Sequence, residues 1–287
     1  MTQLSPSSGR ARPRRRLIAA GGLIALALAL VLAGAWWLAP EDDKPAPGPT
    51  PTPPIPRDLA PEAVTDPAFP SLTYGIHTFL WWNESTRTYD LDMVRLMNFT
   101  HVKQRFSWRD MEPEPGEWHW QQADAVVAEV AYRGRELVAR LDGPPGWALL
   151  DPLPDDSAQP ALDLAAWGTF CGTLAERYRG QIAAYQVWNE PNLRREWFDM
   201  PPDAAGYVAL LRPCAEAIRA ADPEAIVISA GLAPTGTWLP EAIPDTDYLR
   251  MMYDAGAAPW FDVLGVHAPG YGEPPELSPD EAEAVKG

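Results

Sequence analysis

From residue 71 onward, short apolar runs alternate with longer amphipathic stretches. Residues 101–107 and 183–188 have the length and apolar content of strands, whereas 162–178 and 204–221 repeat apolar residues at helical spacing. Such alternation is typical of βα units around a parallel sheet. We predict strands at 72–79, 101–107, 137–141, 183–188, 225–229 and 262–266, and helices at 90–97, 121–133, 162–178, 204–221 and 248–255.

Six strands at this spacing fit a (β/α)8 TIM barrel better than an open nucleotide-binding sheet. The chain has no G-x-G-x-x-G after its first predicted strand and no G-x-x-x-x-G-K-[ST], the phosphate-binding loops of open sheets. Since a barrel has eight units, residues 71–287 are predicted to form an α/β barrel truncated after about six βα units. We expect a fragment of a longer gene product, with a natural truncation as the alternative.

The N-terminal region predicts a membrane anchor. Residues 1–16 are basic, with five arginines, and residues 17–39 contain no charge. The apolar run is long enough to cross a hydrocarbon core of about 30 Å, and the preceding arginines place the N-terminus in the cytoplasm. We expect a single-pass transmembrane helix at the cell membrane, acting as a signal anchor. The alternative is a signal peptide cleaved near Ala35, which would give a secreted protein.

Residues 40–70 predict an extended linker outside the cell. The segment is dominated by proline and has no apolar periodicity. Prolines fix φ and remove backbone donors, so the chain there is semi-rigid. Such a linker would hold the domain at 71–287 away from the membrane surface.

The net charge and the cysteine content limit the classes of partner and cofactor that we expect for this chain. The net charge of −16 argues against nucleic acid, whose phosphates need lysine and arginine, and favours a neutral partner such as a polysaccharide. The thirteen tryptophans suit carbohydrate, because an indole offers a flat apolar face and a polar N–H. Cys171 and Cys214 lack metal-ligand spacing. We expect two buried free thiols, with one disulfide as the alternative, and no metal or organic cofactor.

Polar and aromatic residues gather at the predicted strand ends, which meet at one mouth in a barrel. Glu190 stands out in the segment YQVWNEPN. A carboxyl among Trp and Tyr is partly desolvated, which raises its pKa toward the range of a general acid. Asn189 beside it can hydrogen-bond a sugar hydroxyl. The other candidates for substrate binding are His77, Arg105, Trp108, Asp142, Trp188, His267 and Tyr271.

Three segments resemble clan A glycoside hydrolases, most closely family 39 (the β-xylosidase and iduronidase type), with family 5 cellulases as neighbours. VWNEPN resembles their acid/base motif. FSWRDMEPEPGEW at 106–118 resembles the stretch between their second strand and second helix. Val266-His267, with Tyr271 after it, resembles their sixth-strand site. The resemblance covers about 71–272. It implies a retaining mechanism, in which one carboxyl protonates the leaving oxygen and a second, about 5 Å away, attacks the anomeric carbon.

The resemblance also implies individual roles. Glu190 matches the proton donor, and Asn189 would contact the substrate 2-hydroxyl. Arg105 and His267 match groups that orient or charge-stabilise the nucleophile. Asp142, His77 and Trp108 are candidates for contacts with sugar.

The family's nucleophile is usually a glutamate ending the seventh strand, beyond the last residue given, Gly287. We therefore expect the nucleophile to be missing from this chain, and the chain alone to turn over little or no substrate. The predicted function is that of a membrane-anchored extracellular glycoside hydrolase acting on polysaccharide or oligosaccharide. The alternatives are a noncatalytic, surface-anchored carbohydrate-binding protein and a structural or adhesion module.

Overall fold

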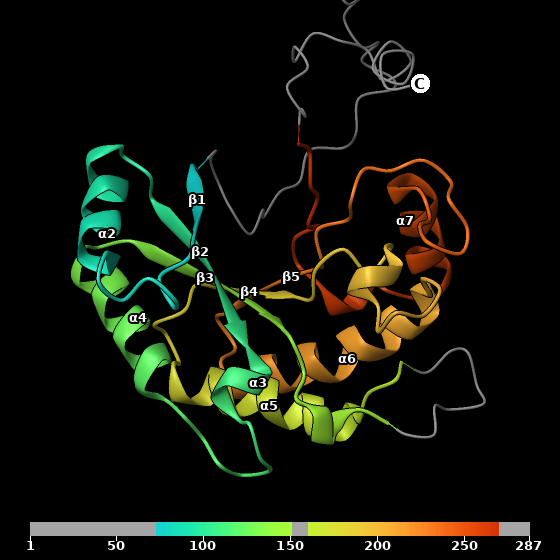
Figure 1. Cartoon of the computed structure of the whole chain (residues 1–287), viewed down its shortest axis with the longest axis horizontal. Coiled ribbons are helices and arrows are strands. Elements are labelled where there is room, and N and C mark those ends of the chain that lie inside the picture. Colours follow the sequence, from blue (N-terminus) through green and yellow to red (C-terminus); the bar gives the residue numbers. More distant parts are fainter. Residues whose placement is uncertain (1–72, 151–159, 270–287) are drawn as a thin grey trace, which may run out of the picture. The chain divides into compact units, whose positions relative to one another are not determined.

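A parallel sheet is central to the computed structural model, which describes residues 73–150 and 160–269 (Figure 1). The strands pair in chain order, and every neighbouring pair is parallel. A doubly wound sheet reverses its order at a switch point, so sequential order is that of a (β/α) barrel wall. The five strands are β1 (Gly75–Thr78), β2 (His101–Ser107), β3 (Glu136–Asp142), β4 (Ala184–Val187) and β5 (Ile226–Ile228).

A helix follows each strand, and α4, α5 and α6 lie along one side of the sheet (Figure 1). Asp163 and Asp203 start α5 and α6, because the Asp163 carboxylate accepts hydrogen bonds from two backbone N–H groups of the first turn and the Asp203 carboxylate accepts one. The long helices are α2 (Arg87–Leu96), α4 (Gln121–Tyr132), α5 (Leu164–Arg177), α6 (Ala204–Ala221) and α7 (Asp245–Asp254). The connections contain α3 (Trp108–Met111), η2 (Gly146–Ala148), η3 (Arg194–Glu196) and η4 (Ala258–Trp260).

The two faces of the sheet differ in chemistry. Register partners in a parallel sheet share a face, and successive residues alternate between faces. The row of Gln104, Ala139 and Tyr185 is fully buried beneath the helices. The opposite face, which we call the inner face, carries the partly exposed cations Lys103, Arg105 and Arg140, and ends at Asp142. The sequence thus builds a helix-covered apolar face and a charged inner face.

Most predicted elements are confirmed, but the sixth strand is wrong. Residues 262–266 make isolated bridges, Ile228 with Val263 and Leu232 with Val266, instead of a strand. The Asp262 carboxylate accepts a hydrogen bond from Val227 N at 2.8 Å. Gly265 lies so close to Ser229 that a Cβ atom would overlap its carbonyl oxygen. Because these bridges do not form a continuous ladder, the sheet in the described part of the chain has five strands.

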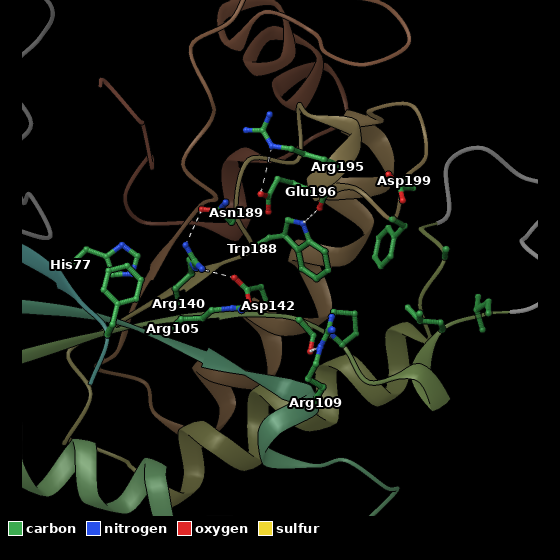
Figure 2. A pocket seen from close by; sticks show the side chains of 17 residues that line it. His77, Arg105, Arg109, Arg140, Asp142, Trp188, Asn189, Arg195, Glu196 and Asp199 are labelled. Carbon is green, nitrogen blue, oxygen red and sulfur yellow. Dashed lines mark hydrogen bonds and ion pairs between the residues drawn. The ribbon is translucent and has the colours of Figure 1, made fainter. Parts of the chain in front are cut away.

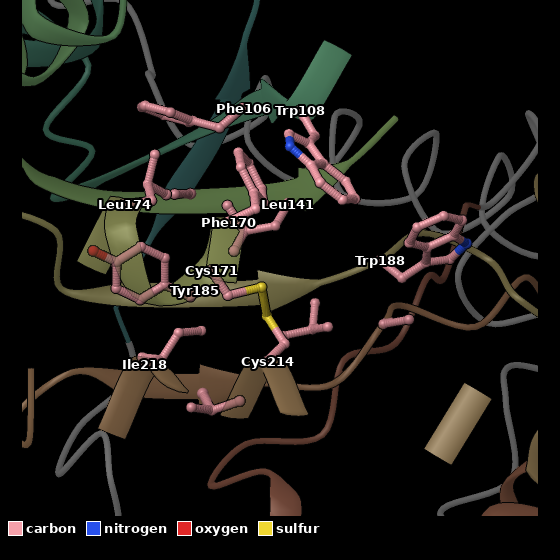
Figure 3. Close-up of a cluster of buried hydrophobic side chains, with 14 of the residues drawn as sticks. Phe106, Trp108, Leu141, Phe170, Cys171, Leu174, Tyr185, Trp188, Cys214 and Ile218 are labelled. Carbon is pink, nitrogen blue, oxygen red and sulfur yellow. A yellow bond between two sulfur atoms is a disulfide. The ribbon is translucent and has the colours of Figure 1, made fainter. Parts of the chain in front are cut away.

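Cys171 of α5 and Cys214 of α6 form a disulfide (Figure 3), which corrects the expectation of two free thiols. The two helices meet unusually closely because α5 carries Gly168 and Gly172 on the contact side. A Cβ atom at Gly172 would lie 3.2 Å from the Ala217 Cβ of α6. This approach leaves the two cysteine Cα atoms 5.3 Å apart, within bridging range.

In the ranges that the structure describes, no helix has the length and apolar character needed to span a membrane. The predicted basic N-terminus at 1–16, transmembrane helix at 17–39 and linker at 40–70 all lie outside those ranges.

Reducing the disulfide should destabilise the fold. The bridge joins residues 43 positions apart, a closure that limits the unfolded chain and is worth about 2–4 kcal/mol. Urea unfolding with and without a thiol reductant measures the difference. The variant carrying Cys171→Ala and Cys214→Ala is the control, because it should match the reduced protein and ignore the reductant. Equal unfolding midpoints for oxidised and reduced wild-type protein would contradict this prediction.

Candidate functional site

A pocket of about 880 Å³ lies at the carboxyl ends of β1 to β4 (Figure 2). Parallel strands of a barrel bring these ends together, which is why residues distant in sequence share it. Its walls include His77 of β1, Arg105 of β2, Arg140 and Asp142 of β3, and Trp188 and Asn189 after β4. The predicted residues His77, Arg105, Asp142, Trp188 and Asn189 are thus gathered in one cavity.

Asp142 organises the pocket floor. Its side chain is buried and lies between two guanidinium groups, with Arg105 Nε donating to Oδ1 and Arg140 Nε 2.8 Å from Oδ2. Arg140 in turn donates from Nη1 to Asn189 Oδ1 at 3.1 Å. The chain Asp142–Arg140–Asn189 therefore fixes the side-chain amide of Asn189 relative to the floor (Figure 2).

Glu190 occupies a turn of unusual backbone conformation. Its φ is +42° and that of Trp188 is +76°, a left-handed region that costs free energy for any residue with a Cβ. The backbone N–H of Glu190 donates to Gly231 O at 3.0 Å. The carboxylate, 18% exposed, lies 2.8 Å from His267 Nδ1 and 3.3 Å from Arg195 Nη2. Glu190 thus sits beside two pocket residues, Asn189 and Arg195.

The pKa of Glu190 is lowered, opposite to the sequence-based prediction. The hydrogen bond from His267 is the largest cause; burial opposes it, and the charges of His267 and Arg195 add to the lowering. In the substrate-free protein Glu190 is therefore a carboxylate at neutral pH. Its pairing stabilises the fold above the ordinary carboxyl pKa and is lost as pH falls through the lowered value.

Gly231 and Asn192 position the turn that carries Glu190 and the side chain of its partner, His267. A Cβ atom on Gly231 would overlap the imidazole of His267, so only glycine leaves room for that ring. The Asn192 side chain is fully buried; it accepts from Ala233 N and donates to the carbonyl oxygens of Ala233 and Ile243. Asn192 therefore ties the turn after β4 to the connection after β5.

Positive charge on the inner face affects its neighbours. Burial, followed by repulsion from Arg140, lowers the pKa of Lys103 to about 8, against the attraction of Asp142 and Glu190. Partial burial, followed by repulsion from Arg140 and Lys103, lowers the pKa of His77 to about 4. His77 is therefore neutral near pH 7, with an N–H available for hydrogen bonding.

Among the predicted residues that the structure describes, Trp108, Glu190 and His267 do not line the pocket. Trp108 is fully buried: its Nε1 donates to Glu112 at 2.8 Å, and its ring packs between Trp147 and Phe170. Tyr271 lies outside the described residues. His267 contacts Glu190, which itself lies next to the pocket residues Asn189 and Arg195.

Sequence reasoning missed several pocket residues. Arg195, Glu196, Phe198 and Asp199 all come from the segment around η3, and Phe79 ends the β1 region. The available signal was the pair of arginines only a few positions after the N-E-P turn, where a side chain can reach back to Glu190. Among the residues that the structure describes, no three His, Cys, Asp or Glu side chains gather to hold a metal ion.

Comparisons with known proteins give the following. The glycoside hydrolase family 42 model, described as β-galactosidase, matches residues 77–155. A solved family 39 glycoside hydrolase from the gut symbiont Bacteroides cellulosilyticus WH2 aligns with a TM-score of 0.51 at 17% identity, covering 70% of this chain and 38% of that chain. A β-galactosidase from the Antarctic haloarchaeon Halorubrum lacusprofundi aligns with a TM-score of 0.47 at 17% identity, covering 73% and 42%. No curated protein matches the sequence.

The family model and the fold confirm the resemblance of this chain to clan A glycoside hydrolases. At 17% identity the aligned family 39 structure establishes the fold alone. The chain spans 38% of the length of that structure. The matched segment ends at residue 155, before β4, so the family match does not include Glu190.

Removing His267 should raise the pKa of Glu190. His267→Asn deletes the largest cause of the lowering, and Arg195→Gln, which deletes a smaller one, should give a smaller rise. The measurement is a pH titration of the Glu190 side-chain carboxyl by ¹³C NMR, with the resonance assigned from Glu190→Gln. An unchanged titration in His267→Asn would show that the pair is not formed in solution.

Gly231→Ala should raise the pKa of Glu190, as His267→Asn should, without changing either side chain of the Glu190–His267 pair. The backbone of Gly231 is not in the left-handed region, so its added methyl acts only by displacing the imidazole. Gly236→Ala is the matched control, because no atom lies within 4 Å of its added methyl. The same NMR titration should show a raised Glu190 pKa for Gly231→Ala and an unchanged Glu190 pKa for Gly236→Ala. Equal titrations in the two variants would contradict the assigned packing.

Proposed function

We propose that this chain carries most of the (β/α) barrel of a retaining glycoside hydrolase that cleaves O-glycosidic bonds in polysaccharide or oligosaccharide, with Glu190 as its acid/base. One observation carries the proposal: Glu190 leaves β4 on a constrained turn, is held by His267, and stands beside the pocket residues Asn189 and Arg195. A carboxyl next to the pocket wall supports this role, because a proton donor has to come within hydrogen-bond reach of the leaving oxygen.

The lowered pKa of Glu190 is compatible with this role if substrate changes its surroundings. Arg195 is 71% exposed where it contacts Glu190, so a sugar entering the pocket can compete with it. Loss of that cation and exclusion of water both favour the protonated carboxyl. Glu190 then gives its proton to the leaving oxygen, and later activates water as a base. The Asn189 amide, oriented by Arg140, contacts the sugar 2-hydroxyl.

The attacking carboxylate is proposed to lie on a further strand outside this chain. Asp142, the other carboxylate at a strand end in the pocket, is bound by Arg105 and Arg140, which suits a supporting role rather than attack. Arg105 and His267 would orient the nucleophile of the completed barrel. The proposal therefore expects little or no turnover from the chain alone.

We further propose that the domain lies outside the cell, anchored at the cell membrane by residues 17–39, with secretion after cleavage near Ala35 as the alternative. The basic residues before the apolar run support this orientation. The Cys171–Cys214 disulfide supports an oxidising compartment.

A noncatalytic carbohydrate-binding protein is the second candidate. It is favoured by the charge state of the pocket, since Glu190 is held as a carboxylate and Asp142 is paired with two arginines. This candidate keeps the cavity and its sugar contacts but predicts no hydrolysis by the completed barrel.

Glu190→Gln in the complete gene product should lower kcat/KM about 10²–10⁴-fold for glycosides with poor leaving groups. Activated aryl glycosides should lose much less, because their leaving groups need no proton. Steady-state kinetics on an aryl glycoside series of graded leaving-group pKa measures the difference. Glu196→Gln, which changes a carboxyl that does line the pocket, is the control and should leave the slope of the series unchanged. Equal loss across the series would refute the acid/base role, and no hydrolysis by the wild type would favour the binding protein.

A further inference from the structure

The turn that follows β1 is held in place by buried side chains and by hydrogen bonds to its backbone. Leu80 and Trp81 are buried, and the Trp81 ring packs edge-on against Phe106 at 5.5 Å. The Leu80 N–H donates to Gln104 Oε1 at 2.7 Å, and its carbonyl accepts from Arg87 Nε at 3.0 Å. Both partners are themselves buried, so the backbone of this turn is fixed.

The same turn exposes two large aromatic rings. Phe79 is 59% exposed and Trp82 is 50% exposed. The His77 and Phe79 rings stack with centroids 5.3 Å apart and planes 17° from parallel. The ring centroid of Trp82 lies 6.5 Å from that of Phe79. We call these three residues, His77, Phe79 and Trp82, the aromatic shelf. Rigidly presented apolar rings in water mark a binding surface.

The aromatic shelf is continuous with the pocket. His77 and Phe79 line it, and Figure 2 shows His77 across the cavity from Arg195, Glu196 and Asp199. Of the exposed large apolar residues, Phe79 and Leu149 line the cavity. A molecule that fills the pocket can therefore extend over the shelf without leaving the protein surface.

We propose that the aromatic shelf is a subsite that binds further sugar rings of a carbohydrate chain whose scissile bond lies at Glu190. Flat aromatic faces take up the apolar C–H face of a pyranose, and the neutral imidazole of His77 can hydrogen-bond a hydroxyl. The subsite rests on the proposed function, since it needs a carbohydrate in the pocket. It selects long chains over short ones.

The test compares binding of short and long sugars to the full 287-residue chain, which needs no turnover. The probes are β-1,4-linked gluco-, xylo-, manno- and galacto-oligosaccharides, as disaccharides and hexasaccharides, measured by calorimetry. We expect hexasaccharides of at least one series to bind more tightly than the disaccharide. Phe79→Ala with Trp82→Ala should weaken hexasaccharide binding about fivefold or more and weaken disaccharide binding much less, because Trp82 lies outside the pocket lining.

Tyr132→Ala is the matched control, because Tyr132 is 88% exposed on α4 and does not line the pocket. It should bind both lengths as the wild type does. Thermal unfolding confirms folding, since both shelf rings are exposed. Equal weakening for short and long sugars, no weakening, or no sugar binding at all would overturn the subsite.

Two further results separate this subsite from its alternatives. Sedimentation that shows a dimer lost in the shelf variant would instead make the shelf a contact between copies of this chain. The leaving-group series with Glu190→Gln reports on the proposed function independently, so a failed shelf with a correct acid/base, or the reverse, can be recognised.

Discussion

Arg105 and Arg140 stand opposite each other on adjacent strands, and the carboxylate of Asp142 makes that arrangement possible. Like charges directly across a sheet repel, and removing the shared carboxylate would leave two partly buried cations without a counter-charge, a destabilising change. Arg140 also donates to Asn189. The position of the amide next to Glu190 is therefore set on β3, one strand away from the turn that carries it.

The protonation state of Glu190 follows from specific partners rather than from burial. Desolvation alone would raise the pKa of this carboxyl, so burial opposes the lowering. A hydrogen bond from His267 outweighs it, and that bond depends on a glycine at position 231 and on the bridges that hold residues 263 and 266 near β5. In the proposed mechanism Glu190 takes up its proton only when substrate displaces these partners, because they favour the charged form.

The sequence allowed the sheet and the meeting of the strand ends to be predicted. β2 and α6 have their predicted bounds because period-two and helical patterns are local properties. His77, Arg105, Asp142 and Asn189 converge because parallel strand ends must. The disulfide, the loss of the sixth strand and the buried Trp108 were not predicted, since each depends on how closely two distant backbones or side chains approach.

The abundance of tryptophan suggested that these residues stack on sugars. In the structure, several are buried in the core and others are exposed. Trp167 and Trp197 are fully buried and pack edge-on against Trp188, whose Nε1 donates to Glu196 O at 2.8 Å. This packing holds Trp188 at a positive φ, and a cost of roughly 1–3 kcal/mol for such a conformation persists only where the surroundings fix it. The buried rings thus hold the turn that carries Asn189 and Glu190. Trp82, in the turn after β1, is instead exposed to solvent. A core substitution at Trp167 would consequently reach the site through backbone conformation rather than through any contact with a sugar.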